Sequence, residues 1–424
     1  MTALVLSAAD ELAGLHDEPA WLRAKRRQAF AVYERLPLPQ RTEEEWRRTS
    51  LKGLDLDAFQ AFEAAGASAP ATPIADTAGV LRQSGSEPGK VEIDPELSRA
   101  GVLFVPLSQA AREYPELVQK HLFQEVRPDR DKLAALHAAL FSGGTFLYVP
   151  DGVSIAKPFV SQFWSSTGGA LVLPHTLIIA GRGSSFNHVD EFLSPDLERP
   201  SLTSGSAEIF AGEASNVGYV ALQRWGNHAW QFADERARLE KDSTVRMVHA
   251  GLGARFSKNR VEASLNGPGA RAELKALYFG TGQQFFDFHT LQQHVVGHST
   301  SDLLFKGALR EQAQSVYAGL IRIEVGASGS DAYQANRNLL LSNQAKANSI
   351  PMLEIMNNDV RCTHGATVGP VDPEHLFYLE SRGIPPMVAQ RMVVHGFFGQ
   401  VLERIPVQQA RELVEQELED RIGF

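Results

Sequence analysis

The sequence predicts a mainly β protein whose two ends are helical. From residue 143 to residue 371, short apolar runs follow one another, each bounded by Gly, Ser, Pro or Asn, as is typical of strands. No helical pattern of convincing length interrupts this region after about Arg246, so the crossover helices of a doubly wound fold are missing. A sandwich, a barrel or a β-solenoid remains, and the chain has no strict hexapeptide or nonapeptide period that would single out the solenoid.

The first 142 residues are expected to form a mostly helical domain. Residues 18–36 space their apolar side chains as a helix does, and Pro37 ends that helix. Residues 61–73 are rich in Ala, Gly and Pro and indicate a linker, whereas 91–142, most clearly 129–141, show helical patterns. The first helix also carries four basic residues that we expect to face solvent: Arg23, Lys25, Arg26 and Arg27.

Residues 372–424 predict a domain of three helices. Asp372 is a suitable N-cap with proline at the first helical position, and Gly383 ends this helix. The next helix, 386–403, has apolar residues on more than one face, so it lies either in a groove of its own protein or against a partner. The last helix, 407–421, is rich in acidic residues that we expect to be solvated.

Composition describes a folded protein without a membrane segment or a disulfide framework. The chain has 424 residues, 43% hydrophobic and 21% charged, and a net charge of −9. The negative charge argues against a nucleic-acid surface, and neither a signal peptide nor a membrane span is indicated. The single cysteine cannot form an internal disulfide, which suits a reducing cytoplasm.

No nucleotide-binding motif has the required spacing. The run GSEPGKV at 85–91 has three residues between its glycines where a phosphate loop has four, and Val91 where that loop has Ser or Thr. Paired glycines such as Gly181 and Gly183 lack the third glycine of the dinucleotide fingerprint, and no G-x-S-x-G elbow is present. We therefore expect the chain neither to bind nor to hydrolyse ATP, and any ATP-driven step would need another protein.

Two groups of polar residues in the β region are candidate sites. His289, His294 and His298 lie close together, but along a strand His289 would face away from the other two, so a shared metal site needs a turn or bulge. Surface or interface histidines are the simpler interpretation. In a β-helix, carboxylates on neighbouring coils could act as the acid and base of a polysaccharide-cleaving enzyme. The candidates for such pairs are Asp287, Asp302, Glu324 and Asp331.

The segment VRCTHGATV holds the chain's one cysteine, Cys362, two residues before His364. Its β-branched residues favour a strand, so both side chains would leave the same face. Two ligands are too few for zinc or a cluster, and a buried thiol beside a structural histidine is the simpler interpretation. A metal role would require further ligands from a partner.

This segment resembles the SufB/SufD family, the scaffold proteins of the SUF system for iron–sulfur cluster assembly. The run CTHGATVG at 362–369 is similar to the C-x-H-G-A-T-V-G run of SufD proteins, and LFYLESRGI at 376–384 matches the family's L-F-Y-L-x-S-R-G-I helix. Residues 41–46 resemble the family's R-x-E-x-W-type element. SufB proteins carry a cysteine thought to receive sulfur at the position that aligns with Ala345, so the likeness is to SufD.

The resemblance implies a right-handed parallel β-helix core, 143–371, between helical domains at 1–142 and 372–424. It also implies a non-enzymatic scaffold without a tightly bound cofactor of its own, which pairs with a SufB-type scaffold and docks a SufC-type ATPase through its C-terminal helices, Phe397 and Phe398 included. His364, weighted above Cys362, would be an interfacial ligand of a transient iron–sulfur cluster. Two alternatives stay open: a purely structural subunit, such as a homodimer, and the carbohydrate-active enzyme.

Overall fold

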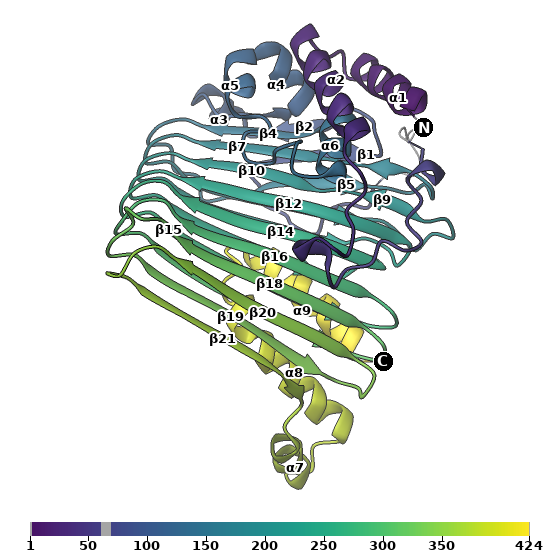
Figure 1. The fold of residues 1–424 in the computed structure, drawn as a ribbon, viewed down its shortest axis with the longest axis vertical. Coiled ribbons are helices and arrows are strands. Elements are labelled where there is room, and N and C mark those ends of the chain that lie inside the picture. Colours follow the sequence, from purple (N-terminus) through teal and green to yellow (C-terminus); the bar gives the residue numbers. More distant parts are fainter. Residues whose placement is uncertain (1, 61–68, 424) are drawn as a thin grey trace.

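The core of the protein is a parallel β-solenoid built from two long sheets, as a computed structural model of residues 2–60 and 69–423 shows (Figure 1). From β10 onward successive strands alternate between the sheets, so hydrogen-bonded neighbours within a sheet come from successive coils. The prediction of a parallel β-helix with helical ends is confirmed. Part of the predicted linker, 61–68, lies outside the described residues.

In spatial order, hydrogen-bonded strands follow one another across each sheet. The first sheet contains β2 (Lys90–Ile93), β1 (Gly79–Ser84), β5 (Phe159–Trp164), β8 (Ser185–Leu193), β11 (Asn216–Arg224), β13 (Thr244–Gly251), β15 (Arg271–Gly280), β17 (Thr300–Leu309), β19 (Asp331–Leu340) and β21 (Arg361–Pro370). The second sheet contains β20 (Lys346–Ile355), β18 (Gln314–Ile323), β16 (Phe285–His294), β14 (Phe256–Leu265), β12 (Ala229–Leu239), β10 (Ser206–Ala211), β7 (His175–Ala180), β4 (Gly144–Val149) and β3 (Leu103–Pro106), with β6 (Leu171–Val172) and β9 (Ser201–Thr203) beside β12.

The length of a coil varies, which explains why no short sequence period is visible. Stacked positions in the first sheet are Thr244, Arg271, Thr300, Asp331 and Arg361, so successive coils contain 27, 29, 31 and 30 residues. The strands keep their register while the turns absorb the difference. A fixed hexapeptide or nonapeptide repeat is therefore not needed to build this solenoid.

Helices from the two ends of the chain cover opposite outer faces of the solenoid (Figure 1). Five N-terminal helices pack against the outer face of the second sheet: α1 (Thr2–Leu15), α2 (Ala20–Arg35), α4 (Leu107–Glu113), α5 (Pro115–His121) and α6 (Lys132–Leu140), with the short η1 (Glu44–Trp46) and η2 (Leu56–Ala58). The short α3 (Pro95–Arg99) packs through Leu97 against the interior core of the solenoid instead. The C-terminal helices are α7 (Pro373–Ser381), α8 (Pro386–Leu402) and α9 (Gln408–Ile422); α8 and α9 pack on the first sheet, and α7 projects from the molecule.

The solenoid begins earlier than the sequence pattern indicated. Strands β1, β2 and β3 lie within the predicted helical domain 1–142, and β1 pairs with β5 in parallel as part of the first sheet. At the other end β21 ends at Pro370, and the Asp372 side chain caps α7. In the described residues, no helix is both long enough and apolar enough to cross a membrane.

One predicted solvent-facing residue of α2 is buried. Arg26 is 1% exposed, lies 2.6 Å from the Glu18 carboxylate, and donates to the backbone carbonyls of Ala139 and Phe141. These carbonyls lie at the C-terminal end of α6, where helix carbonyls lack partners within the helix. The expectation was wrong for Arg26 because the carbonyls that it pairs with are over a hundred residues away.

The last helix is also less solvated than predicted. In α9, Ala410, Val414 and Leu418 are buried against the first sheet. Its Glu417 carboxylate lies 2.6 Å from the Arg224 guanidinium of β11. The apolar residues recur every four positions, so the helix has a narrow packing stripe that its acidic residues obscured in the sequence.

Candidate functional site

The last coil of the solenoid, made of β20 and β21, is its open end. In the described residues each of these strands pairs along one edge, with β18 and β19 respectively, and its other edge is unpaired. Large apolar side chains are exposed on this coil, among them Val368 (43%) and Ile355 (42%). An unpaired strand edge beside exposed apolar groups is a surface that another chain can extend.

Cys362 and His364 both lie on the lumen side of β21. They stack in register on Ala332 and Gln334 of β19, which are fully buried inside the solenoid. Partners in a parallel ladder point to the same side, so the prediction that the two side chains share a face is confirmed. His364 is exposed, whereas Cys362 is half-buried against a small apolar cluster that includes Ile321.

Burial makes Cys362 the weaker of the two candidate ligands. Burial, and secondarily the nearby Asp331 carboxylate, raises the pKa of the Cys362 thiol. A raised pKa reduces the fraction of thiolate, the form that binds metal. The imidazole of His364 is exposed and therefore accessible to a partner.

A hydrogen-bonded network in the lumen supports the strand beneath His364. The Tyr317 hydroxyl donates to Gln334 Oε1 at 3.3 Å and lies 3.1 Å from Thr290 Oγ1, while Gln334 Nε2 donates to the Gly319 carbonyl at 3.2 Å. Both ends of the Gln334 amide are therefore held in place. Sequence reasoning missed this network because its members come from three coils.

The structure separates the three histidines of the candidate metal site. His289 lies on the outer face of the second sheet, His294 is in the lumen between the hydroxyls of Ser299 (2.7 Å) and Ser301 (2.8 Å), and His298 is in a turn with φ of 58°. Across residues 2–60 and 69–423, no three His, Cys, Asp or Glu side chains are grouped so that they could hold a metal ion.

The four candidate carboxylates for acid–base catalysis are not arranged as acid–base pairs. Each lies beside a basic side chain instead, and none is paired with another of the four. The contacts are Asp287 with Lys258 (2.7 Å), Asp302 with Lys275 (2.6 Å), Glu324 with Arg322 (2.8 Å) and Asp331 with Arg361 (3.6 Å).

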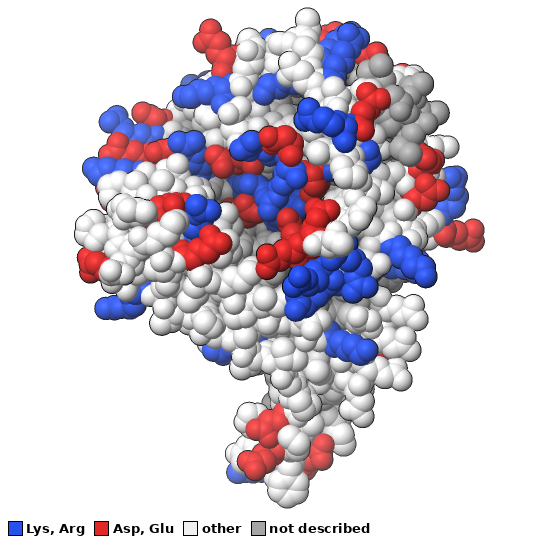
Figure 2. All heavy atoms as spheres, in the orientation of Figure 1, with Lys and Arg blue, Asp and Glu red and all other residues white. Residues whose placement is uncertain are grey.

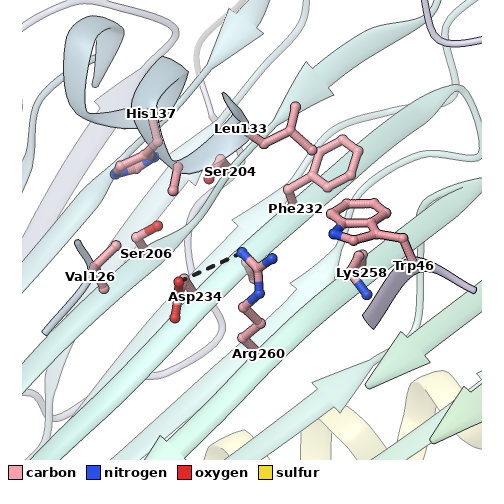
Figure 3. A pocket seen from close by; sticks show the side chains of 12 residues that line it. Trp46, Val126, Leu133, His137, Ser204, Ser206, Phe232, Asp234, Lys258 and Arg260 are labelled. Carbon is pink, nitrogen blue, oxygen red and sulfur yellow. Dashed lines mark ion pairs between the residues drawn. The ribbon is translucent and has the colours of Figure 1, made fainter. Parts of the chain in front are cut away.

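A cluster of ion pairs fastens the segment before β1 to the outer face of the second sheet. Figure 2 shows acidic and basic side chains gathered near the middle of this face. Arg260 of β14 is 2.5 Å from both Glu45 and Asp131. It is also 4.0 Å from Asp234 (Figure 3). We call these four residues the Arg260 cluster. Burial raises the pKa of Asp234 well above its usual range, although Arg260 opposes the shift.

The Arg260 cluster explains the R-x-E-x-W-type element. Glu45 pairs with Arg260, the Trp46 ring is 4.5 Å from Lys258 Nζ, and Thr49 hydrogen-bonds to Asp287. Trp46 is 2% exposed. The element therefore holds the segment against the sheet by charge and aromatic contact together.

The apolar residues in the second half of helix α8 are mostly buried and those in its first half are mostly exposed, which explains why apolar residues occur on more than one face of the helix. Phe398 is fully buried against the first sheet and Phe397 packs beside it, with its carbonyl bonded to Lys306. The expectation that these two residues contact an ATPase is wrong for Phe398, which fills a groove of its own protein. Exposed apolar residues lie instead on α7 and the first half of α8: Phe377 (73%), Tyr378 (57%), Met387 (51%), Met392 (48%) and Val388 (40%). We call these five residues the apolar patch.

Comparisons with known proteins agree with the architecture. The family model for the SufBD core domain of SUF-system iron–sulfur cluster assembly matches residues 163–397, and that for the SufBD N-terminal region matches residues 91–160. The iron–sulfur cluster assembly protein SufD of Bacillus subtilis (strain 168) is 30% identical over 96% of this chain and 95% of its own length. An iron–sulfur cluster assembly SufBD family protein of Staphylococcus epidermidis (strain ATCC 12228) is 27% identical over 97% of this chain and 92% of its own. The chain therefore belongs to the SufBD family of the SUF iron–sulfur cluster assembly system.

Proposed function

We propose that this protein is a non-enzymatic scaffold subunit in cytoplasmic iron–sulfur cluster assembly, and that it pairs with a SufB-type scaffold through the open end of its solenoid. The observation that carries the proposal is the position of an exposed His364 on the last, half-unpaired coil. Main-chain pairing of the partner's strands with β20 and β21 would cover the exposed edges. It would also bring the partner's side chains next to His364.

In this proposal His364 is a ligand of the nascent cluster, with Cys362 in a lesser role. The partner supplies the remaining ligands, because one imidazole and one half-buried thiol are too few for a cluster. A histidine ligand is weaker than a thiolate and suits a scaffold that releases its product.

The experiment is cluster reconstitution in the complete complex with the His364→Ala variant. We expect the complex to form as in the wild type and the visible absorption of the cluster to be lost. His298→Asn is the control, because it removes a turn histidine at a positive φ, which Asn tolerates. A His364→Ala complex that assembles clusters normally would refute the ligand role.

The proposed dock for a SufC-type ATPase is the apolar patch on α7 and the first half of α8. Its five side chains are exposed on helices that extend beyond the solenoid, as a surface awaiting a partner does. Phe377→Asp should weaken ATPase binding without changing the fold. The isolated chain should show no saturable ATP binding, because the phosphate-loop spacing is wrong.

The open end equally suits pairing with a second copy of the chain, which favours a homodimer when the partner is absent. Sedimentation of the purified chain distinguishes monomer from dimer. If the double variant Cys362→Ala, His364→Ala supports full cluster assembly, the purely structural role is correct.

A further inference from the structure

A chain of three buried side chains links the N-terminal helices to the second sheet. His137 Nε2 of α6 is 3.0 Å from His175 Nδ1 of β7, and His175 Nε2 is 3.0 Å from Glu208 Oε2 of β10. All three residues are at most 2% exposed. Neither the cluster ligand role nor the docking surfaces involve them.

The hydrogen-bond partners of Glu208 determine the order of donors. Its carboxylate accepts the backbone N–H groups of Phe123 (2.6 Å), Glu125 (2.7 Å) and Val126 (3.1 Å). A carboxylate so engaged is an acceptor, so His175 donates to it from Nε2, and we assign His175 Nδ1 as the acceptor in its contact with His137. His137 then donates from Nε2, and its own Nδ1 presents a lone pair.

His137 Nδ1 is buried and has no hydrogen-bond partner among the described residues. Burial lowers the pKa of His137 well below its usual range, as expected for a neutral ring. His137 lines a small cavity between α6 and the second sheet, together with Ser204, Ser206 and Asp234 (Figure 3). An unpaired acceptor, two hydroxyl groups and one carboxyl group thus border one space, whose lining also includes Lys258 and Arg260.

The volume of the cavity decides what it can hold. It measures about 20 Å³, whereas one water requires roughly 10–15 Å³. A substrate or an organic cofactor does not fit. An anion finds no free cation there, because the two cationic side chains in the lining are already paired, Lys258 with Asp287 and Arg260 with Asp131.

We propose that this cavity binds one ordered water molecule, which donates a hydrogen bond to His137 Nδ1. Polar groups of Ser204, Ser206 and Asp234 line the same space and provide its other partners. The water completes a hydrogen-bonded connection from β10 through His175 and α6. The bound water thereby connects the helical domain to the solenoid through hydrogen bonds.

The test is a double-mutant cycle with Ala134→Val, because Ala134 lines the same cavity and the added methyl groups would displace the water. In the wild-type background we expect Ala134→Val to lower the melting temperature by about 2–4 °C, since His137 Nδ1 loses its donor. In a His137→Phe background His175 Nδ1 lacks its donor with or without Ala134→Val, and the water has no His137 Nδ1 to pair with, so adding Ala134→Val should lower the melting temperature by less or raise it. The helix propensity of valine is common to both backgrounds and cancels.

A crystal structure of the wild-type protein gives an independent reading. We expect a density peak about 3 Å from His137 Nδ1, absent in Ala134→Val. An empty cavity, a metal ion identified by anomalous scattering, a higher melting temperature for Ala134→Val alone, or equal losses in both backgrounds would each overturn the proposal.

Discussion

Glu45→Gln tests how much the Arg260 cluster contributes to the free energy of unfolding. Glu45 Oε1 is 2.5 Å from Arg260 Nε, and Oε2 is 3.7 Å from Arg130 Nη2. Burial alone would raise the pKa of Glu45, but the charges of Arg260, Lys258 and Arg130 outweigh it and lower the pKa from 4.5 to about 2. The folded protein therefore favours the charged carboxylate.

The shift converts into a stability difference of known sign. Because the folded-state pKa lies below the unfolded-state value, the carboxylate contributes stability that is fully present above pH 4.5 and is lost as the pH falls toward 2. A shift of about 2.5 units corresponds to about 3 kcal/mol. Glu45→Gln should lower the free energy of unfolding by this amount at pH 7, and by about 1 kcal/mol less at pH 3.5.

The measurement is urea unfolding at the two pH values, followed by tryptophan fluorescence, since Trp46 is buried next to the cluster. Glu44→Gln is the matched control, because Glu44 is the preceding residue and is exposed. If the two variants unfold at the same urea concentration, or if the loss in Glu45→Gln is the same at both pH values, the electrostatic reasoning is wrong.

Three further predictions concern other contacts. Phe398→Asp should lower the free energy of unfolding by about 3–5 kcal/mol because it buries an unpaired carboxylate, whereas Met392→Asp, at an exposed position of the same helix, should leave urea unfolding unchanged. Arg26→Met should cost about 3–5 kcal/mol by leaving Glu18 buried without a cation, and adding Glu18→Gln should restore part of the loss; no recovery in calorimetry would contradict the pairing. The rate at which iodoacetamide alkylates Cys362 should rise with pH at a midpoint above that of free cysteine, because burial raises the thiol pKa; a lower midpoint would indicate an activated thiolate.

The sequence by itself determined the features that depend on local geometry. The N-cap at Asp372 and the glycine at 383 located α7, since capping needs only neighbouring residues. Strand alternation placed Cys362 and His364 on one face, because side chains in a strand alternate with a period of two. The mainly β class was also readable, but choosing the solenoid required the family resemblance, since coils of 27–31 residues produce no short period.

Tertiary structure alone decided the contacts between residues distant in the chain. Arginine side chains are usually solvated. Arg26 and Arg260 are buried instead, because packing brings carboxylates or backbone carbonyls next to each of them. Phe398 and the exposed Met392 belong to one helix, and only the position of the first sheet separates a buried half from a free half. The cavity at His137 lies where α6 meets β10, β12 and β14. A sequence pattern shows the periodicity of one element but not which elements meet.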